Sequence, residues 1–334
     1  LISPPIRLSD PPRHIPFATG ILARIAEEKG YNVGILDMNA LRPAPDQVRD
    51  ELRLGPKVSY RVPGSGRGDQ NEYDVIGVGG LSSQFRFIEP LVKDCRAICP
   101  DAAIILGGGV VTTAPREVMT LLPEVDVSSV GEGVETWPEL LRVIDEGGRE
   151  WSDIKGVAYR PRDGKGSEVV LTSPRPLVKA DEIPWPAYHL LPLHIYWQYS
   201  AGIMGPDSPP ELMRSQRRMS IVTEFGCIKN PACGYCSHLG NSASDLSLIY
   251  GCEVKGPNVR YMSAKRVVEH VAWLSKTYHV DFVSILDENF TGNPKRTWEI
   301  CDLLDEYELT GHIHFGCLGS VDTINLPLLR RLYD

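Results

Sequence analysis

Three thiols lie within ten residues of the segment FGCIKNPACGYCSH, residues 225–238. Cys227, Cys233 and Cys236 follow the spacing C-x5-C-x2-C directly after an apolar, strand-like run. A loop of close thiols at a strand end suits a metal centre, because the chelate folds around the ion while the strand fixes its base. The spacing therefore indicates that the chemistry of this segment is metal binding.

Three interpretations fit these thiols. A 4Fe-4S cluster held by three thiolates leaves one iron open to a further ligand, and we favour this interpretation. A structural zinc needs a fourth ligand to close its tetrahedron, for which Cys252 and His238 are candidates. Buried or redox-active thiols without a metal are the third interpretation, although packing alone rarely produces such tight spacing. The thiols in other apolar periodic segments, predicted to be core residues, are Cys95, Cys99, Cys301 and Cys317.

The elements that must position the thiols divide into two α/β parts. In residues 1–150, apolar strand-like runs alternate with amphipathic helical runs, which is typical of a parallel sheet with helices on both faces. The predicted strands are LIS, YNVGILDM, YDVIGVGG, AAIILGGG and VDVSSVG. A doubly wound, Rossmann-like domain of this kind binds its ligand beyond the carboxyl ends of the strands.

The rest of the chain contains a connector and a second α/β part. Residues 151–215 contain a hairpin with a Gly-rich turn and a proline-rich stretch, which together predict a connector. Residues 216–334 predict three βα units, with Ser263 and Pro294 at helix starts. Three units cannot close a barrel. We therefore expect this part to be truncated or to continue beyond residue 334.

Glycines gather at two predicted strand ends of the first part. The segments ILGGGVVTT and SSVGEGVET place them where the missing Cβ lets a bulky ligand approach the backbone. A dinucleotide is disfavoured, because no G-x-G-x-x-G lies between the first strand and its helix. An ordinary tight turn at each strand end remains the alternative interpretation of any single glycine.

The strand, the cysteine loop with CGYC at its end and the following βα units resemble a radical S-adenosylmethionine (SAM) enzyme, although the usual spacing of that family is C-x3-C-x2-C. The resemblance implies that the open iron binds SAM and that an electron from the cluster cleaves it to a 5'-deoxyadenosyl radical. It also implies SAM-binding roles for Asp287 and Glu288, toward the ammonium group, and for Tyr235, against the adenine. The alternatives are loop capping by the two carboxylates and ordinary packing of the tyrosine.

The order of the glycine segments, the hairpin and DEIPWPAYHLLP is similar to cobalamin-binding radical SAM proteins over nearly the entire chain. The resemblance implies a Rossmann-like cobalamin domain followed by a partial radical SAM barrel. The D-x-H-x-x-G loop of mutase-type proteins is missing: Asp37 precedes MNALRP, and His14 is predicted to be a surface residue. We therefore expect a cobalt without a histidine ligand. The residues implied to bind cobalamin are Ser82, Ser83, Gly107, Gly108, Gly109, Thr112, Gly131, Glu132 and Gly133.

The function implied by this resemblance is C-methylation of an unactivated carbon, with a 5'-deoxyadenosyl radical and methylcobalamin. A cobalamin-dependent radical cyclase or rearrangement enzyme is one alternative, and a non-catalytic zinc- or cobalamin-binding module is another. The family's modifiers of methyl-coenzyme M reductase suggest a protein or peptide substrate, such as a glutamine side chain, and an external electron donor is implied. A methylthiotransferase would usually need a second set of three cysteines.

The composition of the chain limits the classes of partner that it could bind. The chain has 334 residues, with 43 acidic and 35 basic residues and a net charge of -8. Because no long basic run is present, nucleic acid is not expected as a partner. No apolar run is long enough to span a membrane and no signal-peptide pattern begins the sequence, so a cytoplasmic protein without membrane attachment is predicted.

Overall fold

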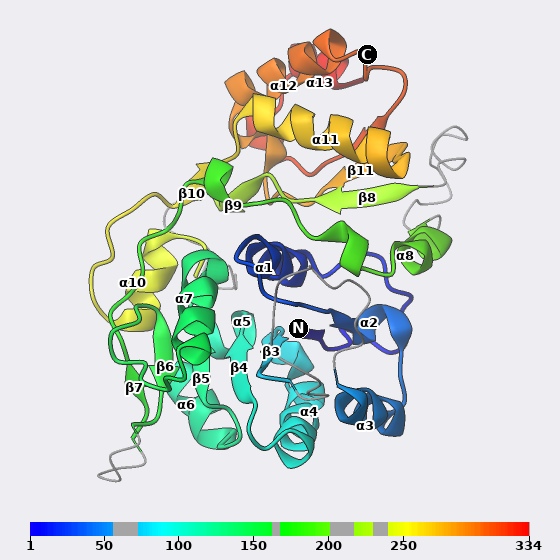
Figure 1. Ribbon diagram of the computed structural model, residues 1–334. Helices are drawn as coiled ribbons and strands as arrows, with labels where there is room; N and C mark the ends of the chain where they lie inside the picture. Colours follow the sequence, from blue (N-terminus) through cyan, green and yellow to red (C-terminus); the bar gives the residue numbers. More distant parts are fainter. Residues whose placement is uncertain (56–72, 162–167, 201–216, 230–239, 334) are drawn as a thin grey trace.

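The structure is a computed structural model that describes residues 1–55, 73–161, 168–200, 217–229 and 240–333. Within these ranges the chain forms two α/β parts joined by a connector (Figure 1). The predicted surface loop after residue 200 and most of the cysteine loop, including Cys233, Tyr235, Cys236 and His238, lie outside the described residues.

The first part is built on one sheet with the strand order β2-β1-β3-β4-β5-β6-β7. Its first five strands pair in parallel, as the sequence predicted. They are β1 (Ile2–Ser3), β2 (Leu36–Asp37), β3 (Val75–Gly79), β4 (Ala103–Gly107) and β5 (Val127–Ser129). The order reverses between β1 and β3, and in open sheets such a reversal opens a ligand crevice beyond the carboxyl ends.

The hairpin that was predicted within the connector belongs to this sheet. Its strands, β6 (Val157–Tyr159) and β7 (Val170–Leu171), add antiparallel pairs beyond β5. All three residues of β6 are buried. A strand covered on both faces gains more apolar burial inside the sheet than in an exposed connector, so the sheet continues past the expected boundary at residue 150.

Helices cover both faces of the sheet, which confirms the doubly wound arrangement. Helices α1 and α7 contact each other and share one buried core, whereas α3 and α4 pack in a second core. The helices are α1 (Phe17–Glu28), α2 (Met38–Leu41), α3 (Pro45–Leu54), α4 (Phe85–Ile98), α5 (Gly109–Thr112), α6 (Pro115–Leu121) and α7 (Gly133–Asp145).

The second part contains the three βα units that the sequence predicted. Their strands pair in parallel in the order β12-β11-β8. Ser263 caps the first helix by accepting a hydrogen bond from the backbone N–H of Arg266. The elements are β8 (Arg218–Ile221), α11 (Ala264–Tyr278), β11 (Phe282–Ile285), α12 (Pro294–Glu306), β12 (His314–Gly316) and α13 (Leu326–Tyr333).

One predicted strand is divided. The run MSIVTEFG, expected as a single strand, forms β8 and then β9 (Glu224–Gly226). The second piece pairs antiparallel with β10 (Val259–Tyr261), a strand that sequence reasoning did not place. Helix α10 (Ala243–Tyr250) was also not predicted. The chain therefore turns out of the parallel sheet just before Cys227.

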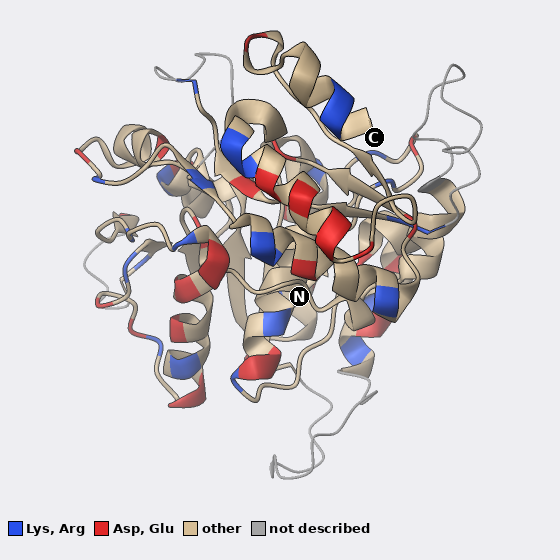
Figure 2. Cartoon of the chain, turned by 90° about the horizontal axis from the view of Figure 1, so that it is seen from above, with Lys and Arg blue, Asp and Glu red and all other residues tan. Residues whose placement is uncertain are grey.

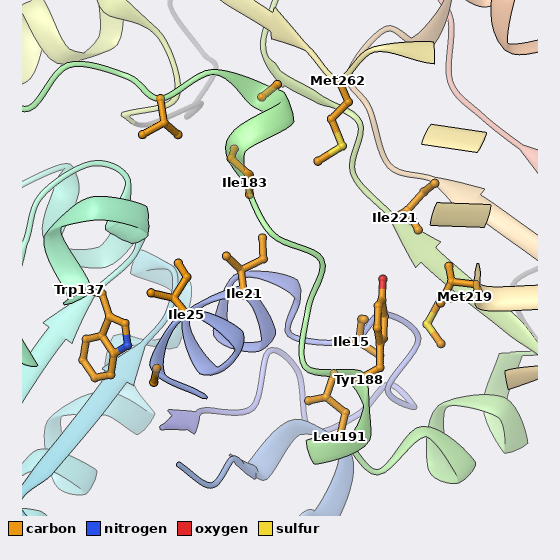
Figure 3. Close-up of a cluster of buried hydrophobic side chains, with 14 of the residues drawn as sticks. Ile15, Ile21, Ile25, Trp137, Ile183, Tyr188, Leu191, Met219, Ile221 and Met262 are labelled. Atoms are coloured by element: carbon orange, nitrogen blue, oxygen red, sulfur yellow. The ribbon is translucent and has the colours of Figure 1, made fainter. Parts of the chain in front are cut away.

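One hydrophobic core spans both parts and the connector (Figure 3). Ile15 and Ile21 come from the first part, Tyr188 from the connector, and Met219 and Ile221 from β8. The connector also contains α8 (Leu193–Ser200). Because the buried contacts are continuous across these segments, the two parts pack as one body rather than as separate domains.

Several predicted core thiols are buried. Cys95, Cys99 and Cys301 are buried, as expected. Cys317 is exposed, so its assignment to the core was wrong. It directly follows β12, whose three residues are all only partly buried.

His270 on α11 is a neutral, buried histidine. It is 1% exposed, its Nε2 lies 3.0 Å from the Tyr188 hydroxyl, and its ring stacks on Trp185 at 4.6 Å. Burial, with a smaller contribution from Arg266, lowers the pKa of His270 from 6.5 to about 3. The His270 imidazole of the unfolded chain therefore binds a proton near pH 6.5, whereas that of the folded chain stays neutral at this pH.

We expect this difference to make stability pH-dependent. The contribution of His270 is complete above pH 6.5 and is lost as the pH falls toward 3, at about 1.4 kcal/mol per pH unit. Urea unfolding at pH 7.0 and pH 5.5 should show a smaller loss in His270→Phe than in the wild type. Replacement of the exposed His312 by phenylalanine should leave the loss unchanged. An equal loss in wild type and His270→Phe would contradict this assignment.

Charges are mixed over the surface. Figure 2 shows basic and acidic residues interspersed along the helices. Within the described residues, no helix has both the length and the apolar character that crossing a bilayer requires.

Candidate functional site

The strand order predicts a ligand crevice beyond the carboxyl ends of the parallel strands, where β3 and β4 end in glycines. Gly79 and Gly107 end these strands and are paired in register. A Cβ added at Gly79 would meet nothing within 4 Å, and at Gly107 only the Cβ of Ser129, at 3.9 Å. Neither glycine has a positive φ, so turn geometry does not require them. Their lack of side chains instead leaves open space where the sheet order predicts a ligand.

Gly108, unlike Gly107, is required by the backbone conformation. Its φ is +85°, and a Cβ there would lie 2.7 Å from the carbonyl oxygen of Gly80. The same oxygen accepts a hydrogen bond from the Val110 N–H at 3.0 Å. The loops after β3 and β4 are therefore joined by backbone contacts, and Gly109 at the start of α5 lies within 3.3 Å of Leu81 by the same measure.

The polar residues predicted to contact cobalamin occupy two environments. Ser82 and Ser83 are exposed beside the crevice, and the Ser82 hydroxyl lies 3.4 Å from that of Thr113. Thr112 is buried, and its hydroxyl accepts a hydrogen bond from the Gly131 N–H at 3.1 Å. A ligand contact of the two exposed serines stays a prediction, whereas Thr112 holds the neighbouring loop in place.

The loop after β5 faces the second part of the chain. Gly131 has φ +86°, and a Cβ on Gly240 would lie 2.8 Å from its Cα. Gly240 follows the cysteine loop directly, so the chain leaving the cysteines packs on the loop after β5. Gly133 packs against Leu22 of α1, with 3.0 Å between its added Cβ and the leucine Cδ2. The glycines of this loop thus serve close packing.

Glu132, between Gly131 and Gly133, forms an ion pair with Arg260. Its carboxylate contacts both terminal nitrogens of Arg260 on β10. Burial raises the pKa of Glu132, and Arg260 opposes this shift. A direct cobalamin contact by Glu132 remains a prediction, but its carboxylate oxygens already have a partner from the second part of the chain.

Cys227 lies immediately after β9 and is partly exposed. Its N–H donates to the Asn258 carbonyl at 3.2 Å. Gly226 before it has φ +95°, and any Cβ there would overlap that same carbonyl oxygen, at 2.0 Å. The first thiol is therefore held by a glycine-dependent turn on the β9–β10 pair. Among the described residues, no group of three or more metal-ligating side chains is present.

Cys252, the candidate fourth zinc ligand, is exposed just after the end of α10. The other candidate, His238, lies outside the described residues. The roles of Cys233, Cys236 and Tyr235 stay predictions for the same reason.

Asp287 follows β11 and ties it to the turn between β8 and β9. Its carboxylate accepts hydrogen bonds from the N–H of Thr223 at 2.6 Å, from the Thr223 hydroxyl and from the N–H of Glu224 at 3.0 Å. Its side chain is buried, and Arg296 lies 4.0 Å away. This geometry is that of a capping carboxylate, the alternative given above for the acidic pair. Glu288 beside it is exposed and is better placed to meet a ligand.

Sequence reasoning missed Glu224 and Arg296. Glu224 is 4% exposed, and burial, followed by the nearby Asp287, raises its pKa from 4.5 to about 8 while Arg296 opposes the shift. A charged residue inside the apolar run MSIVTEFG was the available signal. A carboxyl of this kind, three residues before Cys227, holds its proton at neutral pH.

Glu224→Gln should therefore remove a pH dependence of stability. The folded pKa lies above the unfolded pKa, so the stability contributed by the neutral carboxyl is complete below pH 4.5 and is lost as the pH rises toward 8. We expect Glu224→Gln to unfold at a higher temperature than the wild type at pH 8, and to differ less at pH 5. Glu299→Gln, at an exposed position of α12, should change neither value. A lower melting temperature for Glu224→Gln at pH 8 would contradict the neutral state of this carboxyl.

His14 is not a surface residue but lies at the junction of the two parts. Its Nδ1 lies 2.8 Å from the Ser220 hydroxyl on β8, and burial, with Arg13, lowers its pKa. Met219 and Ile221 pack in the core with α11. Because side chains alternate along a strand, Ser220 faces the opposite side, which is the barrel interior.

Small residues line this interior face side by side. The strand register places Ser284 beside Ser220, and Gly316 beside Ser284. One row earlier, the Arg218 guanidinium lies 5.0 Å from the Phe282 ring centroid and closes the interior below them.

Known proteins similar to this chain include a methyltransferase and a cyclase. No family model matches the chain. The chain is 30% identical over 262 residues to an uncharacterised methyltransferase of Pyrococcus horikoshii, covering 78% of this chain and 49% of that protein. It is 22% identical over 300 residues to the anaerobic magnesium-protoporphyrin IX monomethyl ester cyclase of Synechocystis, covering 89% and 52%. The chain thus spans about half the length of these curated relatives.

Solved structures with the same fold are similar over nearly the whole chain. The cobalamin-dependent SAM radical enzyme OxsB, with aqua-cobalamin and SAM bound, matches with a TM-score of 0.61 and 16% identity, covering 94% of this chain and 37% of that one. The radical SAM methyltransferase TsrM of Kitasatospora setae, with cobalamin and a 4Fe-4S cluster bound, matches with a TM-score of 0.56 and 17% identity, covering 91% and 49%. The predicted resemblance to cobalamin-dependent radical SAM enzymes and the predicted α/β fold are confirmed.

Proposed function

We propose that this chain binds cobalamin in the crevice beyond β3 and β4, a 4Fe-4S cluster on Cys227, Cys233 and Cys236, and SAM beside that cluster. We further propose that it acts as a radical SAM C-methyltransferase. The observation that carries the proposal is the contact of Gly131 with Gly240, because it places the loop beside the crevice directly against the chain leaving the cysteines. The solved structures of OxsB, with cobalamin and SAM, and of TsrM, with cobalamin and a 4Fe-4S cluster, support these cofactors, and the methyltransferase relative supports the reaction class.

The residues present fit these groups. Gly79 and Gly107 leave open space at the crevice, and three thiols suit a cluster with an open iron. When bound, the cluster would supply the electron that cleaves SAM, and cobalamin would supply the methyl group.

The protein's own part is to position the cofactors and the substrate and to exclude water from them. Asp287 fixes the turn that leads into Cys227, and exposed Glu288 is the candidate partner for the SAM ammonium. His14 and Ser220 line the junction on the barrel-interior side, where the substrate would have to lie between the two cofactors.

The substrate is proposed from resemblance alone. A protein side chain, such as a glutamine of methyl-coenzyme M reductase, is our first candidate, with an external protein as electron donor. A cyclase is the second candidate, because an anaerobic cyclase is among the relatives.

Incubation of the full-length, reduced protein with CD3-labelled SAM tests the proposal. The proposal predicts release of 5'-deoxyadenosine, and mass spectrometry should find a CD3 group on the carbon skeleton of a glutamine-containing peptide or another substrate. Release of 5'-deoxyadenosine with conversion of a magnesium-porphyrin ester, but without transfer of label, would favour the cyclase. No 5'-deoxyadenosine from protein that has bound iron and sulfide would overturn the radical chemistry.

A further inference from the structure

Arg260 on β10 contacts four other segments of the chain. The two N–H groups of Nη1 donate to Glu132 Oε2 at 3.1 Å and to the Val178 carbonyl at 2.6 Å. Those of Nη2 donate to Glu132 Oε1 and to the Asn241 carbonyl, at 3.2 Å in the second case. The guanidinium also lies 5.4 Å from the ring of Phe225. One side chain thus contacts the loop after β5, the connector, the chain after the cysteines and the strand before them.

The ion pair between Arg260 and Glu132 is buried. The side chains are 6% and 13% exposed. Charges taken out of water are tolerated only when their hydrogen bonds are satisfied, and removal of one partner leaves the other uncompensated. A bidentate Arg–carboxylate pair also fixes relative orientation, which a lysine point charge cannot do.

The pair is adjacent to the backbone contact between the same two loops. Glu132 follows Gly131, and Asn241 follows Gly240; these two glycines pack within a distance that excludes any side chain. The Thr112 hydroxyl holds Gly131 from the crevice side. The loops at the crevice and at the cysteines are therefore fixed to one another by the ion pair, by a backbone contact and by one hydroxyl.

We propose that Arg260 and Glu132 are positioning residues that set the distance between the cobalamin crevice and the cluster loop. This inference rests on the proposed function and assigns Glu132, predicted above as a cobalamin contact, to alignment of the two sites. A methyl group and a radical that originate on different cofactors must reach one substrate carbon, so a small displacement between the sites would be costly.

We call the Arg260–Glu132 ion pair the clamp. Hydrogen exchange on the full-length protein tests the clamp without any cofactor. Arg260→Gln and Glu132→Gln should each raise exchange in peptides covering 128–134 and 240–246 by at least about tenfold, because each leaves a buried charge unpaired. The double variant should add little to either single variant. The matched control is Arg96→Gln, which breaks a partly buried pair with Asp126 in the first part of the chain and should leave 240–246 protected. Unchanged exchange in Arg260→Gln would overturn the clamp.

Electron paramagnetic resonance tests its functional meaning. In protein loaded with cob(II)alamin and a reduced cluster, the magnetic coupling between the two spins reports their separation. Arg260→Gln should widen the distribution of this coupling, while cobalt and iron contents stay within about twofold of the wild type. Arg260→Lys should restore the wild-type distribution only in part. Unchanged coupling together with raised exchange would contradict the positioning role and leave a purely structural pair. If the wild type binds no cobalt or iron, the proposed function fails while the exchange result still decides the clamp.

Discussion

Cys227→Ala is expected to remove the cluster and all SAM cleavage. Three thiolates are the minimum that holds a 4Fe-4S cluster with an open iron, and Cys227 is the thiol that the β9–β10 pair holds in place through Gly226. Iron should fall from about four per chain to below about one. Release of 5'-deoxyadenosine should fall to the level without enzyme. Anaerobic purification followed by iron and sulfide analysis measures the first, and chromatography of the reaction measures the second.

Cys252→Ala is the matched control. Cys252 is the described candidate for the fourth ligand of a closed zinc site. The iron–sulfur interpretation predicts full iron content and unchanged SAM cleavage in this variant. Loss of metal in Cys252→Ala to the same extent as in Cys227→Ala would contradict a three-thiolate cluster and favour zinc.

Gly107→Leu should prevent cobalamin binding while sparing the cluster. The added side chain would enter the open space at the carboxyl end of β4, and backbone geometry does not oppose it because φ is negative. We expect the Kd for hydroxocobalamin to rise by at least about tenfold, or about 1.4 kcal/mol. Visible absorbance after equilibrium dialysis measures the Kd, and iron content should remain that of the wild type.

Gly34→Leu is the matched control for this effect. Gly34 also has open space around it, but it lies before β2, at the opposite end of the sheet. Its replacement should leave cobalamin binding unchanged. Equal affinity of Gly107→Leu and the wild type would show that cobalamin lies elsewhere.

Local patterns predicted the parallel sheet and the three βα units because the information lies within each segment. The strands at Val75–Gly79 and Ala103–Gly107 are apolar runs ended by glycines, and α11 begins at a serine cap. The division of MSIVTEFG into β8 and β9 was not predictable in this way. It depends on Asp287, 64 residues away along the chain, which binds the backbone of Thr223 and turns it out of the sheet.

Part of the site was not predicted because its contacting residues lie far apart in the sequence. Glu132 read as one polar residue among glycines, and nothing near it indicated its partner Arg260, which is 128 residues away. His14 lacked any flanking motif, and only the fold brings it to Ser220. Glycine and cysteine motifs therefore indicate candidate ligand sites, whereas the contacts between the two loops could be found only from the structure.

Metal analysis of the anaerobically purified full-length protein tests the central claim most directly. Iron, sulfide and cobalt would be measured together with the visible spectrum. The two-cofactor proposal predicts about four irons, about four sulfides and, after reconstitution with cobalamin, about one cobalt per chain. Zinc in place of iron would contradict it, and iron without cobalt would remove cobalamin from the crevice and leave radical SAM chemistry with a different ligand there.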